Sequence, residues 1–379
     1  MKYKIKYLNL HEQHKAVYQS FDKELKKIFV NSSFVLREHV KKFENEIAKK
    51  LKAKYVVGLN SGTDALLMGL CAANIKKGDE IIVPSHTYVA TISAIVHVGA
   101  KPIFVDIDED FNINPDLIQK KITRKTKAIV PVHLNGHSCN MKEIVKIAKK
   151  NKLKIVEDAA QSFGSKQNNI YSGTFGECGA FSLHPMKNLN VPGDGGFLVT
   201  NKKKVYDMVS LLRDHGRARA NKSFGIKKQH LKCFGFNSRL DNIHAAIALI
   251  KLKKFDRWIQ QRRKVAQYYH KNLKNIKSIK LPIFEFKNKK YFDTYNSYVI
   301  RVKKRNLLKK YFKRFGVEVF SHMDRGIHLE KKLITKKWHL PKTEKIESEI
   351  ISLPIYSEMK KSSQDYIIKI IKKFYLNKS

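Results

Sequence analysis

The sequence predicts an α/β protein in which a large domain with a mainly parallel sheet precedes a smaller α+β domain. Two observations predict this fold. From about residue 40 to about residue 200, short apolar stretches alternate with amphipathic ones, as expected of strands joined by crossover helices. After Leu240 the pattern changes to a long helical stretch, and residues 275–379 mix strands with helices. We therefore expect residues 1–250, N-terminal segment included, to form the large domain and residues 251–379 the small one.

The individual elements follow from the same patterns. Continuous apolar runs predict strands that helices cover on both faces. These strands are Tyr55–Leu59, Glu80–Pro84, Pro102–Val105, Ala128–Val132, Lys154–Glu157, Gly179–Leu183 and Phe197–Thr200. Helical periodicity predicts Met141–Lys150 between two of them and one long helix over Asp241–Asn272. For the small domain we expect strands Ser297–Val302 and Val317–Phe320 and helices Asn306–Phe315 and Ser362–Phe374.

The composition favours a soluble, cytoplasmic, globular protein. The chain has 379 residues, of which 42% are hydrophobic, enough for a packed core. No apolar run reaches the roughly 20 residues that a membrane span needs, and the N-terminus lacks the apolar stretch of a signal peptide. The four cysteines are scattered without metal-like spacing, which indicates reduced thiols and predicts no metal site.

The formal net charge of +43 raises the alternative of a nucleic-acid-binding protein. However, the lysines are spread along the whole chain, and Asn and Ile are also plentiful. This pattern is typical of a genome rich in A and T, so we expect no nucleic-acid partner. The diffuse positive field would still attract an anionic substrate such as a nucleotide diphosphate.

Two motifs that follow predicted strands could hold an anion. In Gly58-Leu-Asn-Ser-Gly-Thr-Asp-Ala-Leu66 a strand ends and a helix begins, so the free N–H groups near Gly62 and Thr63 could bind a phosphate. Ser182, at the end of a later strand, could donate to the same phosphate. An ordinary helix cap is the alternative for the first motif.

Two further motifs could hold an aromatic ring. Tyr88 follows the strand that ends at Pro84 and could stack on a flat cofactor, although a core tyrosine is the alternative. Asp158 and Gln161 follow the apolar run Leu153-Lys-Ile-Val156. A carboxylate there could pair with a protonated pyridine nitrogen, and Gln161 could bond the ring hydroxyl. A surface acid is the alternative for Asp158.

Lys187 is the candidate for a covalent role. It lies in the segment Phe181-Ser-Leu-His-Pro-Met-Lys-Asn-Leu-Asn-Val-Pro-Gly-Asp-Gly-Gly196, whose composition differs from that of the rest of this lysine-rich chain. Most lysines of this chain are solvated surface groups, so Lys187 alone indicates little. An amine, a carboxylate for a pyridine nitrogen, a stacking ring and a phosphate cradle together are what pyridoxal phosphate chemistry requires.

These motifs make the chain similar to the DegT/DnrJ/StrS family of nucleotide-sugar aminotransferases. The resemblance runs from about Leu8 to about Tyr356 and includes Asn60–Leu66, Pro84–Thr91, Glu157–Gln161 and Ser182–Gly196. It implies the fold of type I pyridoxal-phosphate transferases, which is like that of aspartate aminotransferase. It also implies a homodimer whose two active sites are shared between the subunits.

The resemblance assigns roles to individual residues. Lys187 matches the lysine joined to the cofactor, Asp158 the partner of the pyridine nitrogen, Gln161 the contact to the ring hydroxyl and Tyr88 the stacking ring. The phosphate cradle corresponds to Gly62, Thr63 and Ser182, with Asn237 reaching it from the neighbouring subunit. The candidates for substrate contacts are His184, Arg239, His322 and His328.

The implied reaction moves an amino group from glutamate to a keto group of a nucleoside-diphosphate-linked deoxy sugar, and the expected carrier is dTDP. The segment around Asn237–Asp241 and the pair His322 and His328 are more similar to family members acting at C-3 than at C-4. His322-Met-Asp-Arg-Gly-Ile-His328 nevertheless lacks the His-Tyr-Pro typical of such members. The alternatives are a type I enzyme of other chemistry, such as a sugar dehydratase or an amino-acid aminotransferase, and the basic nucleic-acid binder.

Overall fold

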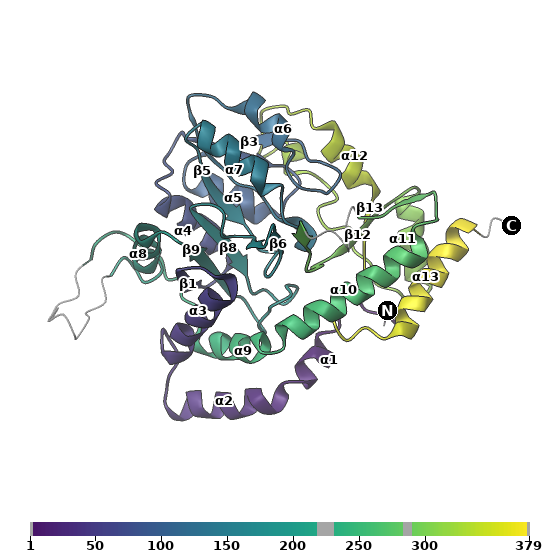
Figure 1. Ribbon diagram of the computed structural model, residues 1–379, viewed down its shortest axis with the longest axis horizontal. Helices are drawn as coiled ribbons and strands as arrows, with labels where there is room; N and C mark the ends of the chain where they lie inside the picture. Colours follow the sequence, from purple (N-terminus) through teal and green to yellow (C-terminus); the bar gives the residue numbers. More distant parts are fainter. Residues whose placement is uncertain (1–2, 218–230, 283–289, 377–379) are drawn as a thin grey trace.

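A computed structural model describes residues 3–217, 231–282 and 290–376 of the chain. Figure 1 shows a large layered part built around a central sheet, and a smaller part beside it that carries both termini. The long helix α10 (Phe255–Leu273) runs from the first part to the second.

The central sheet has seven strands in the order β1-β9-β8-β5-β4-β2-β3. Neighbouring strands run parallel from β8 to β3, whereas β9 is antiparallel to both β1 and β8. This confirms the predicted mainly parallel sheet. Its strands are β1 (Tyr55–Leu59), β2 (Glu80–Pro84), β3 (Lys101–Val105), β4 (Thr126–Ile129), β5 (Lys154–Asp158), β8 (Cys178–Ser182) and β9 (Gly196–Thr200).

Two of the seven predicted strands are shifted along the chain: β8 lies one residue before the expected Gly179–Leu183, and β4 is shifted further. We expected Ala128–Val132, but β4 ends at Ile129. Pro131 explains the early end, because proline has no N–H to donate to a sheet ladder. Beyond Pro131 only a single bridge, between Val132 and Asp158, continues the pairing with β5.

Helices cover both faces of the sheet, as its apolar strands require. One face packs on α4 (Gly62–Ala72), α5 (Val89–His97) and α8 (Lys203–Leu212). The other face packs on α3 (Glu38–Leu51), α7 (Met141–Lys150) and α9 (Asn242–Leu252). The remaining elements of this part are α1 (Leu10–Lys15), α2 (Tyr18–Val30), α6 (Pro115–Ile118), β6 (Lys166–Gln167), β7 (Ile170–Tyr171) and the 3₁₀ turns Gln119–Lys121 and Leu134–Gly136.

The single helix predicted over Asp241–Asn272 is two helices, α9 and α10, separated at Lys253 and Lys254. The break has a packing reason. Ala245 and Ala248 of α9 belong to the core between helices and the large sheet, whereas Tyr269 and Leu273 of α10 belong to the core of the C-terminal part. The turn redirects the chain so that Phe255 and Ile259 at the start of α10 still pack in the first core, and the later turns of α10 enter the second.

The C-terminal part is built on the antiparallel sheet β10-β12-β13. Its elements are β10 (Ile279–Lys280), β12 (Tyr298–Val302), α11 (Arg305–Arg314), the 3₁₀ turn Ile327–Leu329, α12 (Pro341–Glu349), β13 (Ile350–Leu353) and α13 (Lys361–Leu376). Another short strand, β11 (Tyr291–Phe292), instead pairs with β6 of the large part. The predicted strand Val317–Phe320 forms only two bridges, from Val317 to Ile5 and from Phe320 to Ser352.

The first residues pack with this C-terminal part. Ile5 is buried in its core, and the Tyr7 N–H donates to Glu318. We expected the N-terminal segment to lie with the large domain, and the packing of Ile5 differs from this expectation. The pairing of Ile5 with Val317 joins residues far apart in the sequence, so no local pattern could predict it. The expected boundary near residue 250 stays a prediction.

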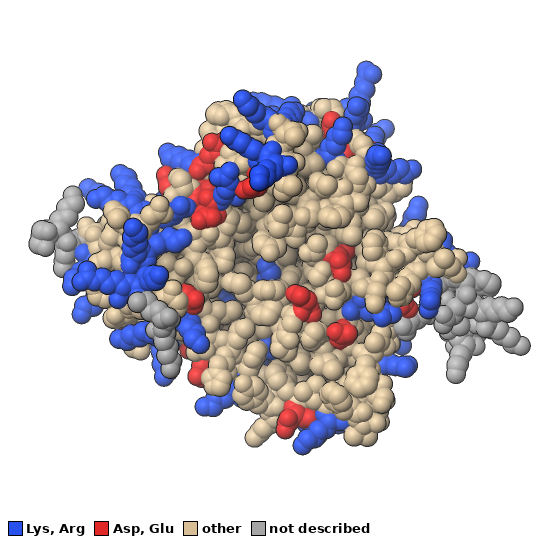
Figure 2. All heavy atoms as spheres, turned by 180° about the vertical axis from the view of Figure 1, so that it is seen from behind, with Lys and Arg blue, Asp and Glu red and all other residues tan. Residues whose placement is uncertain are grey.

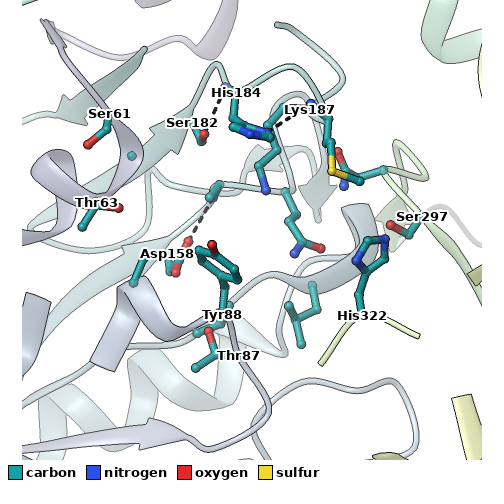
Figure 3. Close-up of a pocket in the computed structure, with 18 of the residues that line it drawn as sticks. Ser61, Thr63, Thr87, Tyr88, Asp158, Ser182, His184, Lys187, Ser297 and His322 are labelled. Carbon is teal, nitrogen blue, oxygen red and sulfur yellow. Dashed lines mark hydrogen bonds between the residues drawn. The ribbon is translucent and has the colours of Figure 1, made fainter. Parts of the chain in front are cut away.

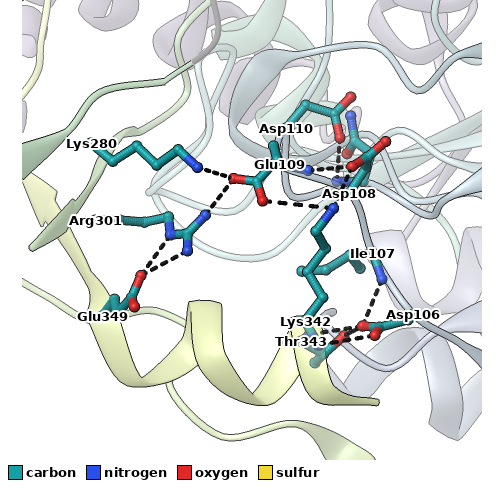
Figure 4. Close-up of polar contacts among 11 residues, drawn as sticks. Asp106, Ile107, Asp108, Glu109, Asp110, Lys280, Arg301, Lys342, Thr343 and Glu349 are labelled. Carbon is teal, nitrogen blue, oxygen red and sulfur yellow. Dashed lines mark hydrogen bonds and ion pairs between the residues drawn. The ribbon is translucent and has the colours of Figure 1, made fainter.

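A set of polar contacts joins the loop after β3 to the C-terminal part (Figure 4). Asp106 accepts hydrogen bonds from the Thr343 N–H at 2.7 Å and the Lys342 N–H at 3.0 Å, at the start of α12. A carboxylate is favourable there because the first N–H groups of a helix lack helical partners. Glu109 pairs with Arg301 at 2.6 Å, and Arg301 also pairs with Glu349. These contacts hold the two parts against each other.

The chain is strongly basic, with a formal net charge of +43. Figure 2 shows Lys and Arg side chains spread around one face, whose middle is mostly uncharged. In the described ranges, no helix is both long enough and apolar enough to cross a membrane. Nor do three or more His, Cys, Asp or Glu side chains gather there in a way that could hold a metal ion.

Candidate active site

A cavity of about 440 Å³ lies at the carboxyl ends of the parallel strands, where α/β sheets bind their ligands. Segments that follow β1, β2, β5 and β8 line it, together with residues from both ends of the chain (Figure 3). Nine of the twelve site residues predicted from the sequence line this cavity. They are Gly62, Thr63, Tyr88, Asp158, Gln161, Ser182, His184, Lys187 and His322.

Asp158 ends β5 and is 5% exposed. Its Oδ2 accepts a hydrogen bond from the Thr91 hydroxyl at 2.7 Å, and its Oδ1 accepts one from the Ala160 N–H at 3.1 Å. Thr91 in turn contacts the Thr87 hydroxyl at 2.7 Å. These donors fix the carboxylate at the cavity wall, so the predicted alternative of a surface acid is wrong.

Lys187 follows β8 and extends its side chain into the cavity (Figure 3). Burial lowers the pKa of Lys187, and the negative charge of Asp158 offsets part of this effect. A lowered pKa increases the fraction of the neutral amine, which is the nucleophilic and basic form. Lys187 is therefore suited to both covalent and proton-transfer chemistry.

One end of the cavity is a cradle for an anion. Ser61 caps α4 by accepting a hydrogen bond from the Asp64 N–H at 3.0 Å, so the first amides of α4 face this end. A Cβ atom on Gly62 would lie 2.9 Å from the Ser182 Cβ. Glycine is thus required for the close approach of α4 to β8, and this approach brings the Ser182 hydroxyl beside the start of the helix.

The middle of the cavity offers a flat ring and an amide. The Tyr88 side chain is 67% exposed and lines the cavity, so it is no core tyrosine. Gln161 accepts a hydrogen bond from the Asn135 N–H at its Oε1, at 2.9 Å. Because that oxygen is engaged, the amide nitrogen is the group that Gln161 offers to a ligand.

The other end of the cavity combines the N-terminal segment with the C-terminal part. His322 stacks on Phe320 with ring centroids 5.2 Å apart and meets the edge of Tyr7 at 5.3 Å. The Tyr7 hydroxyl donates to the Ser297 hydroxyl at 3.3 Å. Burial lowers the pKa of His322, and the nearby charge of Lys187 lowers it further, against an opposing effect of Asp324. The neutral form of the His322 imidazole is therefore favoured more than in a free histidine.

The pKa of His184 is lowered like that of His322. Burial lowers its pKa, Lys187 lowers it further, and Asp194 raises it in part. Its backbone also shapes the loop: the His184 N–H donates to the Ser182 hydroxyl at 3.2 Å, and its carbonyl accepts from the Lys187 N–H at 2.9 Å. His184 thus both faces the cavity and braces the loop.

Three predicted residues lie outside the cavity. His328 is 5% exposed and contacts the Ser85 hydroxyl through Nδ1 at 2.6 Å. This buried contact connects β2 to the C-terminal part, so the structure does not support His328 as a substrate contact. Arg239 pairs with Asp214 at 2.9 Å. Asn237 is exposed on the surface, and its expected role requires a second subunit.

The sequence motifs missed several residues of the site. Thr91 ends the motif Pro84–Thr91 and lies one helical turn after Tyr88. This spacing was a signal that the Thr91 hydroxyl could bond the Asp158 carboxylate. Tyr7 and Ser297 carried no comparable signal. They reach the cavity only because distant segments meet there.

The arrangement fits pyridoxal phosphate. The start of α4 and Ser182 suit the phosphate, Tyr88 offers a ring for stacking, and Asp158 suits a protonated pyridine nitrogen. Lys187 supplies the amine for the covalent bond. Tyr7, Ser297 and His322 also line the cavity and are left for a substrate.

The chain is similar to known proteins over almost its full length. A model of the DegT/DnrJ/EryC1/StrS aminotransferase family matches residues 16–372. The chain is 36% identical over 373 residues to a pleiotropic regulatory protein of Geobacillus stearothermophilus, covering 97% of this chain and 98% of that protein. It is 35% identical over 374 residues to the dTDP-3-amino-3,6-dideoxy-alpha-D-galactopyranose transaminase of Aneurinibacillus thermoaerophilus, covering 98% and 99%.

A solved structure shares the fold over its full length. DesV of S. venezuelae, determined in complex with a ketimine intermediate, has a TM-score of 0.92 and 29% sequence identity, with 100% of both chains covered. Other relatives are named for UDP-linked and GDP-linked sugars, so the sugar nucleotide varies among these proteins.

Proposed function

This chain belongs to the DegT/DnrJ/EryC1/StrS aminotransferase family, and on that premise we propose that it aminates a keto sugar linked to a nucleoside diphosphate. Glutamate is the proposed amino donor and pyridoxal phosphate the cofactor. The observation that carries the proposal is the meeting of Lys187, Asp158, Tyr88 and the start of α4 in one cavity. The presence of Lys187 favours transamination over the dehydratase alternative.

The cofactor, when bound, supplies an aldehyde that takes up an amino group and an electron-poor ring that accepts electrons from the adjacent carbon. The protein residues bind and orient it and move protons. The amides at Gly62 and Thr63 and the Ser182 hydroxyl would hold the phosphate, and the Gln161 amide would bond the ring hydroxyl. Asp158, fixed by Thr91, would keep the pyridine nitrogen protonated.

Lys187 performs the proton transfer. Its lowered pKa leaves a larger share of Nζ unprotonated, so Nζ can take a proton from the substrate carbon that bears nitrogen. The same atom returns the proton in the second half of the reaction, when the sugar receives the amino group. His184 and His322, both with lowered pKa, flank this position without adding positive charge.

The substrate end of the cavity supports a sugar. Tyr7, Ser297 and His322 present hydroxyl and imidazole groups that can hydrogen-bond sugar hydroxyls. We propose a dTDP-linked deoxy sugar aminated at C-3, as is the sugar for which the Aneurinibacillus relative is named. The net charge of +43 favours attraction of the diphosphate. All four thiols are free, which suits a reducing compartment such as the cytoplasm.

The direct test compares acceptors with glutamate as the donor. We expect turnover with dTDP-linked 3-keto deoxy sugars and none with free keto acids other than the 2-ketoglutarate of the donor couple. Mass spectrometry of the sugar product would show the aminated carbon. Turnover only between amino acids and keto acids would contradict the proposal and favour the amino-acid aminotransferase.

We also propose a homodimer with shared sites. Phe29, Val30, Phe34 and Val35 are exposed apolar side chains, and Phe236 is 43% exposed. The two regions adjoin, because Val35 bridges Asp241 and the Asn242 N–H donates to the Phe34 carbonyl. Such a patch indicates a protein interface. Asn237 lies in the same region, where it could reach the phosphate cradle of a second subunit.

Mixing two inactive variants tests this sharing. If Asn237 serves the partner's site, Lys187→Ala and Asn237→Ala subunits combine into dimers with one intact site. After subunit exchange of a 1:1 mixture, we expect about a quarter of the wild-type activity, since half of the dimers are mixed and half of their sites are intact. The matched control is Lys187→Ala mixed with Asp158→Asn, which restores nothing because both residues serve the same subunit's site. No recovery in the first mixture would contradict shared sites.

A further inference from the structure

A buried lysine behind the active-site loop has no role in the reaction described above. Lys251, near the end of α9, is 0% exposed. Its Nζ donates to Asn190 Oδ1 at 2.5 Å and lies within hydrogen-bond distance of His14 Nε2, at 3.0 Å. Burial lowers the pKa of Lys251 to about 7, with Glu358 opposing this in part. Burying an amine in this way is unfavourable, so the position calls for an explanation beyond packing.

The contacts of Asn190 define the orientation of its side-chain amide. The oxygen accepts from Lys251, while the nitrogen donates to the Lys187 carbonyl at 2.8 Å and to Gln13 Oε1 at 3.2 Å. If the amide were rotated by half a turn, its NH₂ group would face the Lys251 amine and its oxygen would face two other oxygens. Lys251 therefore selects the orientation in which Asn190 can bond Lys187.

The Lys187 backbone is held on both sides. Its N–H donates to the His184 carbonyl at 2.9 Å, and its own carbonyl accepts from Asn190. The next residue, Asn188, is also buried and donates to the Thr294 carbonyl at 3.2 Å. The reactive side chain thus starts from a backbone whose position depends on these bonds, since its own amine must remain free to react.

We propose that Lys251 and Asn190 are positioning residues, in which Lys251 orients the Asn190 amide and that amide holds the Lys187 carbonyl. The inference rests on the proposed function in one respect, namely that Lys187 carries the reactive amine. Gln13 and His14 belong to α1, so the same network ties the N-terminal helix to the active-site loop. A reacting group displaced by about 1 Å can lose about 10²-fold in rate, which makes such an anchor valuable.

Two variants of the full-length, cofactor-loaded protein test the proposal. Lys251→Met keeps a side chain of similar length and removes the donor that orients Asn190. Asn190→Asp keeps an acceptor for Lys251 but cannot donate to the Lys187 carbonyl. For both we expect kcat to fall by about tenfold or more while KM for the sugar nucleotide changes little. The control is Lys253→Met, an exposed lysine two residues further, which should behave as wild type.

Hydrogen exchange measured by mass spectrometry separates positioning from general stability. We expect faster exchange in the peptide that contains Lys187–Val191 and unchanged exchange elsewhere, with a melting temperature close to that of the wild type. Lys251→Met removes the cost of burying an amine, which offsets the cost of leaving Asn190 Oδ1 without its donor, so we expect little change in the melting temperature.

Two results would overturn the proposal: wild-type kcat and loop exchange in both variants, or faster exchange along the whole chain with a lowered melting temperature. The exchange at Lys187 does not depend on turnover. A failure of the assignment of Lys187 as the reactive amine, seen as no borohydride-dependent label there, can therefore be told apart from a failure of the positioning network.

Discussion

A Lys187→Ala protein is expected to lose transamination by at least about 10⁴-fold, because one side chain provides both the covalent attachment and the proton transfer. The fold should persist, since Lys187 lines a cavity and its removal leaves no unfilled core. Steady-state rates with glutamate and a keto sugar nucleotide would measure the loss. Circular dichroism and the melting temperature would show whether the variant is folded.

Chemical labelling tests the same assignment without turnover. Borohydride reduction of the wild-type protein, followed by peptide mapping, should place a pyridoxyl group on Lys187 and on no surface lysine. Lys204→Ala is a suitable control, because Lys204 is exposed on α8 and should be dispensable for activity. A label elsewhere, or turnover of Lys187→Ala at the wild-type rate, would reject Lys187 as the reactive amine.

An Asp158→Asn protein is expected to retain its cofactor site but lose about 10²-fold or more in kcat. The amide has the same shape and can still accept from Thr91, but it carries no negative charge to keep a pyridine nitrogen protonated. Thr91→Val provides a graded comparison, because it removes one bond to Asp158 and leaves the charge. We expect its loss in kcat to be smaller than that of Asp158→Asn.

Asp158→Asn should also change the pKa of the Lys187 amine in a predictable direction. Asp158 raises the pKa of Lys187 against the larger effect of burial, so Asp158→Asn should lower this pKa further. The rate at which an amine reagent labels Lys187 in cofactor-free protein, followed against pH, reports this pKa. The labelling midpoint should move to lower pH in Asp158→Asn. An unchanged midpoint together with an unchanged kcat would remove Asp158 from the proposed site.

The sequence predicted the cofactor half of the cavity well because that half is built from local motifs. Gly62, Asp158 and Lys187 each come shortly after the end of a predicted strand, and parallel strands bring their carboxyl ends to one edge of the sheet. Strand position, helix capping and glycine requirement depend on a few neighbouring residues. A reading of short segments was therefore sufficient to identify these residues as candidates.

The elements that the sequence misplaced depend on longer-range packing. No glycine or proline marks the break between α9 and α10 in the sequence, and α10 then continues from the core of the large part into that of the C-terminal part. The segment Val317–Phe320 has the composition of a strand, but its two ends pair with Ile5 and Ser352 on different segments. Apolar periodicity does not indicate which partner a segment will meet.

The sequence by itself determined the α/β fold, the motifs at the strand ends and the candidate amine at position 187. Only the tertiary structure decided the other half of the cavity, where Tyr7 meets Ser297 across 290 residues and His328 is buried away from the ligand space. It also placed Lys251 and Asn190 behind Lys187. The physical reason is that capping and strand formation are set within a few residues, whereas burial and hydrogen-bond partners depend on where distant segments pack.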